Sequence, residues 1–364
     1  MFRQKLSLNL DEIMPGMVTA EQININDDEG KLVMTVRPST VLSEDIIRRL
    51  ARHKLVEAAV YLNEASVPDT PPIESMLDDS LREEAVDNIR SLFGALGEGG
   101  NMTTAYQAVR ELDNIVGRLV DTINSESNSY VHIADLKSYD EYTYHHSLSV
   151  AVLAIAIGTG LGLNLVQLKR LGQCAIMHDI GKTDIPLEII NKPGRLTNEE
   201  FEIIKQHAVK SGEYLERGEI GDAEIWSSVV HHHEKMDGSG YPDGLKGDDI
   251  PFFSKIISVA DVYDAVTSYR SYRKPMPPGE AIEMVMSEIG RSFEYKIVKV
   301  FIDKLELYPI NSIVELTSNR LGLVVDNTDN LRPTLRMLDD GSIVDLMNLD
   351  NLSLIITRVM DMTG

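Results

Sequence analysis

The sequence is poor in cysteine and tryptophan. Its 364 residues contain one of each. Because a single cysteine, Cys174, excludes an internal disulfide, a reducing, cytoplasmic location is expected. The first five residues lack the long apolar core of a secretory signal.

Positive charge is also scarce. Lys and Arg number 35 against 57 Asp and Glu, which gives a net charge of −22. Such a surface repels polyanions, so a nucleic-acid polymer is excluded as the expected ligand. An anionic substrate would need a locally positive pocket.

The chain has no long hydrophobic run. Its most apolar segment, residues 148–163, is interrupted by Ser149, Gly158 and Gly160. It is shorter than the roughly 20 residues that a membrane span needs. We expect a buried helix there and no membrane span.

Patterning along the chain predicts a mainly α protein of several domains. Residues 1–65 hold two β-prone runs and a helix, which predicts a small N-terminal α/β module. Residues 66–104 form a linker and helix. From 105 to 305 the pattern is almost wholly helical, and in residues 306–364 a period of two between turns predicts a small β-barrel or sandwich.

An apolar seam precedes the most apolar segment. It could join two subunits as a coiled coil, but it covers about two heptads where three or four are wanted. Packing on the next domain is therefore favoured, and a homodimer stays open. The seam consists of Val109, Leu112, Val116, Leu119 and Ile123.

Histidines and embedded acids mark a candidate site in the helical region. Asp179 and Asp261 lie among apolar residues, where burial is costly unless the carboxylate is paired or binds a metal. A lone helical histidine is more often a core or surface residue than a ligand, but several together indicate a metal site. The five candidate histidines are His146, His178, His207, His232 and His233.

The ordered motifs resemble one family. They are His178-Asp179-Ile180-Gly181-Lys182, the run HHHEKMDGSGYPDGL at 231–245, DVYDA at 261–265, and RSYR at 270–273. Over residues 105–305 they resemble the HD-GYP branch of the HD phosphohydrolases. The resemblance implies an all-helical HD-type metal-binding domain and a cyclic di-GMP phosphodiesterase, a hydrolase of bacterial signalling.

The resemblance also implies two divalent metal ions. Iron is the first choice and manganese the second, since imidazole and carboxylate ligands suit first-row metals. In some family members an acidic residue of a three-metal site precedes the first histidine by one turn, and here Tyr142 takes that place, which favours two metals. By this resemblance, one metal would be held by His146, His178 and Asp261 and the other by His207, His232 and His233, with Asp179 bridging both.

Two metals in such a site acidify a water and clamp the phosphate oxygens. Asp179 and Lys182 are the predicted catalytic residues. Lys182 lies about one turn after His178 and could place its ammonium near the phosphate; the alternative is a solvated lysine at a helix end.

Three further side chains are predicted to bind substrate together with Lys182. Arg270 and Arg273 are three apart, so they share a face on a helix or tight turn, and their guanidinium groups suit the second phosphate or a guanine edge. Tyr241 lies in a glycine-rich loop, where it could stack on a guanine, donate its hydroxyl or merely cover the core.

The expected function is hydrolysis of cyclic di-GMP to linear pGpG, with a further step to GMP left open. Two alternatives stand beside it: a module that binds cyclic di-GMP with little turnover, and a phosphohydrolase for another cyclic dinucleotide. The GYP loop and the end modules could contact protein partners.

Overall fold

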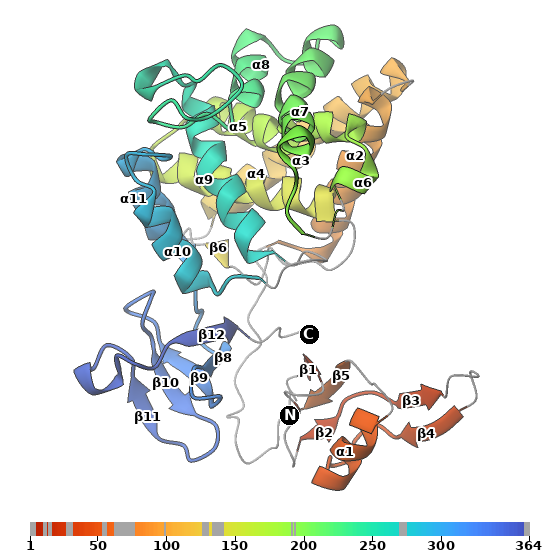
Figure 1. Ribbon diagram of the computed structural model, residues 1–364, viewed down its shortest axis with the longest axis vertical. Helices are drawn as coiled ribbons and strands as arrows, with labels where there is room; N and C mark the ends of the chain where they lie inside the picture. Colours follow the sequence, from red (N-terminus) through yellow and green to blue (C-terminus); the bar gives the residue numbers. More distant parts are fainter. Residues whose placement is uncertain are drawn as a thin grey trace. The chain divides into compact units, whose positions relative to one another are not determined.

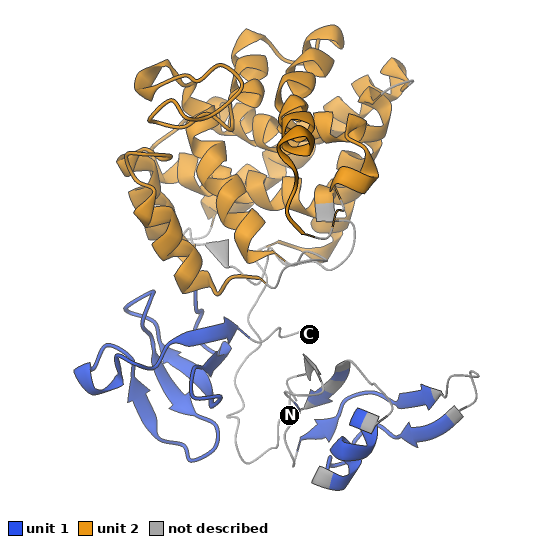
Figure 2. Ribbon diagram, viewed as in Figure 1, with its two compact units in different colours: residues 1–74, 307–364 blue, residues 75–306 orange. Residues whose placement is uncertain are grey.

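The computed structural model describes residues 5–9, 13, 17–26, 32–52, 57–61, 77–97, 100–125, 131–132, 142–190, 192, 194–268 and 275–359. The chain forms two compact units (Figure 2). One consists of residues 75–306, and the other combines residues 1–74 with 307–364. Each unit is described by itself.

In its described residues, the unit of residues 75–306 is mainly helical (Figure 1), with one short parallel strand pair, β6 (Val131–His132) with β7 (Leu305–Glu306). Among its described residues, no helix is long and apolar enough to cross a membrane. Its helices are α2 (Asp79–Leu96), α3 (Met102–Ser125), α4 (Tyr142–Gly160), α5 (Leu165–Met177), η3 (Ile180–Asp184), α6 (Leu187–Ile190), α7 (Asn198–Arg217), α8 (Ala223–Val230), η4 (Gly247–Asp249), α9 (Phe252–Thr267), α10 (Pro278–Ser287) and α11 (Tyr295–Lys304).

Helix α4 is the central element of this unit. It is apolar around its whole circumference, with every residue from Leu148 to Ala156 buried, as expected for a helix enclosed by others. It packs against α5, α9 and α11. The prediction of a buried helix in this segment is confirmed.

The apolar seam of α3 is covered within the same unit. Leu112, Val116, Leu119 and Ile123 are buried, and α3 packs against α2, α4 and α5. The face that could have formed a coiled coil between subunits is therefore used inside the unit.

Side-chain caps fix where two site-bearing helices begin. The Asn164 side chain caps α5 and the Thr197 side chain caps α7. In return, the side chain of the third residue of each helix accepts a hydrogen bond from the backbone N–H of the capping residue. Between them, Gly181 lets η3 approach α7, because a Cβ there would lie 2.2 Å from the carbonyl oxygen of His207. The motif glycine thus brings Asp179 next to His207.

The second unit contains two β-rich segments. The small N-terminal α/β module has an antiparallel sheet in the order β1 (Lys5–Asn9), β5 (Glu57–Tyr61), β2 (Val18–Thr19), the hairpin of β3 (Ile23–Asn26) and β4 (Leu32–Val36), and helix α1 (Glu44–Arg52). The C-terminal segment has β8 (Ile313–Leu316), β9 (Leu321–Asp326), β10 (Thr334–Met337), β11 (Ile343–Asp345), the turn η5 (Leu349–Asn351) and β12 (Ile356–Val359).

The C-terminal strands form one open sheet. Their order is β11-β10-β9-β8-β12, all antiparallel, so β11 and β12 are edges in the described residues. A barrel would require those two edges to pair. Of the predicted barrel or sandwich, the barrel is therefore wrong, because alternating polarity identifies strands but does not determine whether a sheet closes. The apolar cluster of this unit includes Leu42 and Val60 as well as Ile313 and Leu323.

Candidate metal centre

The seven predicted ligands meet in the middle of the helical unit. His146 lies on α4, His178 ends α5, Asp179 precedes η3, His207 lies on α7 and Asp261 on α9. His232 and His233 follow the end of α8. All are buried except the half-buried His233, and every one belongs to a group able to hold a metal.

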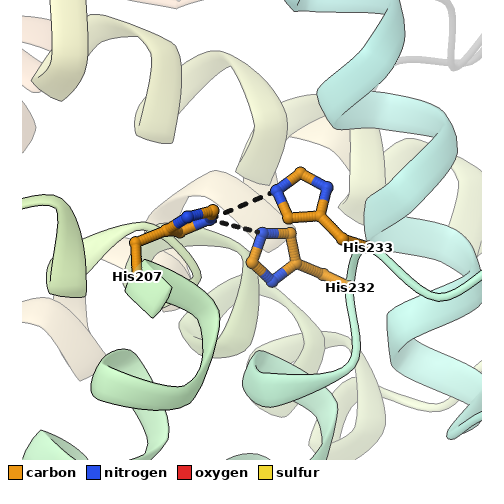
Figure 3. A group of neighbouring side chains, drawn as sticks. All are labelled: His207, His232 and His233. Atoms are coloured by element: carbon orange, nitrogen blue, oxygen red, sulfur yellow. Dashed lines mark hydrogen bonds between the residues drawn. The ribbon is translucent and has the colours of Figure 1, made fainter. Parts of the chain in front are cut away.

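Three of the histidines face one another (Figure 3). The Nε2 atom of His207 lies 3.4 Å from Nε2 of His232 and 3.2 Å from Nε2 of His233. Nδ1 of His207 donates to the Ile204 carbonyl at 2.6 Å, and Nδ1 of His232 donates to the Val229 carbonyl at 2.6 Å. Since a neutral imidazole has one N–H, the Nε2 atoms of His207 and His232 present lone pairs to each other. A shared cation would turn that repulsion into attraction.

The spacing of these nitrogens suits a metal. Imidazole nitrogens bind first-row metals at about 2.0–2.1 Å, so two ligands at octahedral or tetrahedral angles lie about 2.8–3.4 Å apart. The observed 3.2 and 3.4 Å agree with this value.

The remaining ligands form a second group beside the first. Nε2 of His146 lies 3.1 Å from Oδ1 of Asp261, and Nε2 of His178 lies 3.9 Å from the same oxygen. Nδ1 of His178 donates to the Ala175 carbonyl at 2.6 Å, and Nδ1 of His146 donates to Oδ2 of Asp264 at 2.6 Å. Both rings are therefore oriented with Nε2 toward the centre, as metal-binding histidines are.

Asp179 stands between the two groups. Its Oδ2 lies 3.6 Å from Nε2 of His146 and 3.3 Å from Nε2 of His178, whereas its Oδ1 lies 3.3 Å from Nε2 of His207. Within the described residues, Oδ1 of Asp179 and Nε2 of His178 are buried and make no hydrogen bond. Buried polar atoms normally have partners, so these atoms fit a divalent metal centre.

Burial keeps His207, His232 and His233 neutral. It lowers the pKa of His207 to about 4, that of His233 to about 3, and that of His232 well below its usual value. Neutral imidazoles are the form that binds metals.

His146 has the opposite environment. Burial lowers its pKa, but hydrogen bonds to Asp261 and Asp264 and the charges of both carboxylates outweigh burial and raise it to about 9. Burial raises the pKa of Asp179, but the charges of His178 and Lys182 dominate and bring that pKa well below the usual range. The centre is thus built to hold positive charge beside ionised carboxylates.

Comparisons with known proteins agree with this geometry. The family model described as "HD domain" matches residues 131–297. A Pseudomonas aeruginosa protein named as a cyclic di-GMP phosphodiesterase is 32% identical over 283 residues, which cover 76% of this chain and 67% of that protein. This chain belongs to the HD-GYP family.

Two further proteins resemble parts of this HD-GYP chain. A Vibrio cholerae protein named 3'3'-cGAMP-specific phosphodiesterase 2 is 40% identical over 128 residues, 35% of this chain and 24% of its own length. The solved structure of an HDG"Y"P protein from Bdellovibrio bacteriovorus superposes with a TM-score of 0.52 at 17% identity, covering 82% of this chain and 98% of that one. The latter likeness shows a shared fold alone.

The lysine of the HD-GYP motif contacts Asp179. The Lys182 ammonium on η3 lies 2.5 Å from Oδ2 of Asp179, and about a quarter of the Lys182 side chain is exposed. The lysine is therefore a member of the centre and keeps a route to solvent.

The GYP loop (residues 238–244) folds back on the segment that carries His233. A Cβ on Gly240 would lie 2.5 Å from the Cα of Glu234, so only glycine fits. Oε1 of the buried Glu234 accepts the backbone N–H groups of Asp243 at 2.7 Å and Gly244 at 2.9 Å. The Tyr241 ring consequently lies 4.7 Å from the His233 ring, centroid to centroid, at 33°.

Four further residues weighed from the sequence lie outside the described residues or outside the metal-capable groups. Arg270 and Arg273 lie outside the described residues, and so does the side chain of Tyr142, whose backbone begins α4. His231 is absent from the metal-capable groups of the described residues; its Nε2 lies 3.0 Å from Oδ2 of Asp243.

Sequence reasoning missed two residues on α7. The Phe201 ring lies edge-on to Tyr241 with 6.4 Å between centroids, and Lys205 lies near both rings. The available signal was an aromatic residue six positions before the predicted ligand His207 on the same helix.

Proposed function

We propose that this chain is a metal-dependent phosphodiesterase that hydrolyses cyclic di-GMP. The observation that carries the proposal is the position of Asp179, whose two carboxylate oxygens face separate groups of buried histidines. The Pseudomonas aeruginosa relative named as a cyclic di-GMP phosphodiesterase supports the choice of substrate.

The proposed centre holds two divalent cations, iron or manganese by the nitrogen and oxygen character of the ligands. Asp179 would be a ligand of both ions. When bound, they would acidify a water molecule and neutralise the phosphate oxygens of an in-line displacement. The first ion would be held by His146, His178 and Asp261, and the second by His207, His232 and His233.

The protein itself would orient the ligand histidines and balance negative charge on the phosphate. Carbonyl or carboxylate partners at Nδ1 hold the rings of His146, His178, His207 and His232 with Nε2 inward. The Lys182 ammonium is proposed to stabilise negative charge developing on the phosphate.

Three side chains are proposed to bind the rest of the substrate. Tyr241, at the edge of the centre, would contact a guanine, and Arg270 and Arg273 would meet the second phosphate or a guanine edge. Opening one phosphodiester of the ring gives linear pGpG; GMP would need a second hydrolysis at the same centre.

A second candidate is hydrolysis of a different cyclic dinucleotide. The Vibrio cholerae relative named as 3'3'-cGAMP-specific favours this candidate, since it shares 40% identity over 128 residues. Binding without turnover is less favoured, because a receptor does not require seven converging ligands with Lys182 beside them.

The experiment is hydrolysis of a cyclic dinucleotide panel by the metal-loaded protein, with linear products separated by chromatography and Asp179→Ala as the control. We expect cyclic di-GMP to give pGpG, and we expect the variant to give none. Faster turnover of a hybrid dinucleotide would support the second candidate. Binding of cyclic di-GMP by metal-replete protein without any linear product would overturn the enzyme assignment.

A further inference from the structure

An exposed aromatic ring extends the site outward from the metal centre. The Tyr241 ring lies against His233, and the Phe201 ring meets Tyr241 edge-on at 83°. Phe201 is 46% exposed, so nearly half of its surface has no protein partner. The three rings form a continuous wall from a proposed metal ligand to solvent.

A lysine lies beside this wall. Lys205 follows Phe201 by four residues on α7, so both project from one face of the helix. The Lys205 ammonium lies 5.2 Å from the Phe201 ring centroid and 5.7 Å from that of Tyr241, within range of a cation–π interaction with each. Its ion pair with Glu202 involves a carboxylate that is 66% exposed, and such pairs exchange readily with a competing anion.

The combination of a flat aromatic face with an adjacent cation is the chemistry that holds a nucleobase and its phosphate. It also gives an acidic protein of net charge −22 a local attraction for an anionic ligand. We propose that Phe201 and Lys205 form an outer subsite: Phe201 stacks on a base of the bound cyclic dinucleotide, and Lys205 attracts its phosphate. This inference rests on the proposed function.

The test compares Phe201→Ala with Phe252→Ala in the metal-loaded protein. Phe252 is a matched control on α9, because it is 44% exposed and also lies 6.4 Å from one neighbouring ring, that of Phe253. Loss of a base stack should lower kcat/KM for cyclic di-GMP roughly 5- to 150-fold, through KM, with metal content unchanged. Phe201→Trp should restore KM, and Phe252→Ala should match the wild type.

The lysine has its own variants. Lys205→Met keeps the aliphatic stem and removes the charge, so KM should rise and depend less on salt, whereas Lys205→Arg should retain binding. An unchanged KM in Phe201→Ala with an active wild type would overturn the subsite and leave the proposed function intact. Loss of metal from Phe201→Ala would assign the ring a structural role and also overturn it. A wild type that neither binds nor hydrolyses any cyclic dinucleotide would overturn both proposals.

Discussion

Asp264 offers a way to perturb one half of the metal centre without touching the other. Its Oδ2 accepts the Nδ1 proton of His146 at 2.6 Å, and both side chains are 1% exposed. Among the described residues, His207, His232 and His233 form a metal-capable group that does not include Asp264, although His232 also groups with His178 and Asp261. Asp264→Ala should therefore lower the binding affinity only of the metal that His146 would hold.

The size of the effect follows from the nature of the contact. A hydrogen bond to a charged group contributes about 1.5–3 kcal/mol. That energy corresponds to roughly 10- to 150-fold in a binding constant. Removing the outer partner of a metal-binding histidine typically costs about 10- to 100-fold in affinity, which is the same range.

The assay is titration of metal-free protein with Mn²⁺, following bound metal per chain. We expect two classes of metal site in Asp264→Ala, one near the wild-type affinity and one with an affinity lower by about 10- to 100-fold. Asp243→Ala is the matched control, because its carboxylate also contacts a histidine, His231, that is outside the proposed ligand set. An equal loss of affinity for both metals, or no loss for either, would refute the division of ligands. Asp264→Asn preserves the side-chain volume and is the control for a folding defect.

Two other substitutions test neighbouring parts of the motif. Lys182→Met should lower kcat about 10²- to 10³-fold while metal content persists, as expected for loss of a transition-state cation; an unchanged kcat would reduce the lysine to a partner of Asp179. Gly181→Ala places a Cβ 2.2 Å from the His207 carbonyl, so η3 must move from α7, and we expect a loss of about 1–3 kcal/mol in unfolding free energy by thermal denaturation. Gly94→Ala, with no atom within 4 Å of its Cβ, should leave stability unchanged or raised, and equal melting temperatures for the two variants would contradict the packing argument.

The sequence predicted a mainly helical region and a set of candidate ligands within it. Ordered motifs pointed to seven candidate residues, and the structure brings these side chains together although they span residues 146–261. Embedded acids such as Asp179 were informative because a buried carboxylate without a partner is costly. The assignment of each ligand to a particular metal remains a prediction.

Features that depend on contacts between distant segments could not be read from the sequence. Closure of the C-terminal sheet depends on edge pairing, which alternation does not encode. Oε1 of Glu234 accepts two backbone N–H groups of the GYP loop, and only the folded loop reveals that contact. Phe201 and Tyr241 are separated by 40 positions, so their common wall is likewise a property of the tertiary fold.

We propose that this chain hydrolyses cyclic di-GMP with the help of two metal ions, both of which would have Asp179 as a ligand. The most direct test is the rate of linear product formation as Mn²⁺ or Fe²⁺ is added back to metal-free protein. The account predicts no turnover without metal and a plateau at two metal ions per chain, with Asp179→Ala inactive throughout. Full turnover by metal-free protein, or a plateau at one ion per chain, would contradict it.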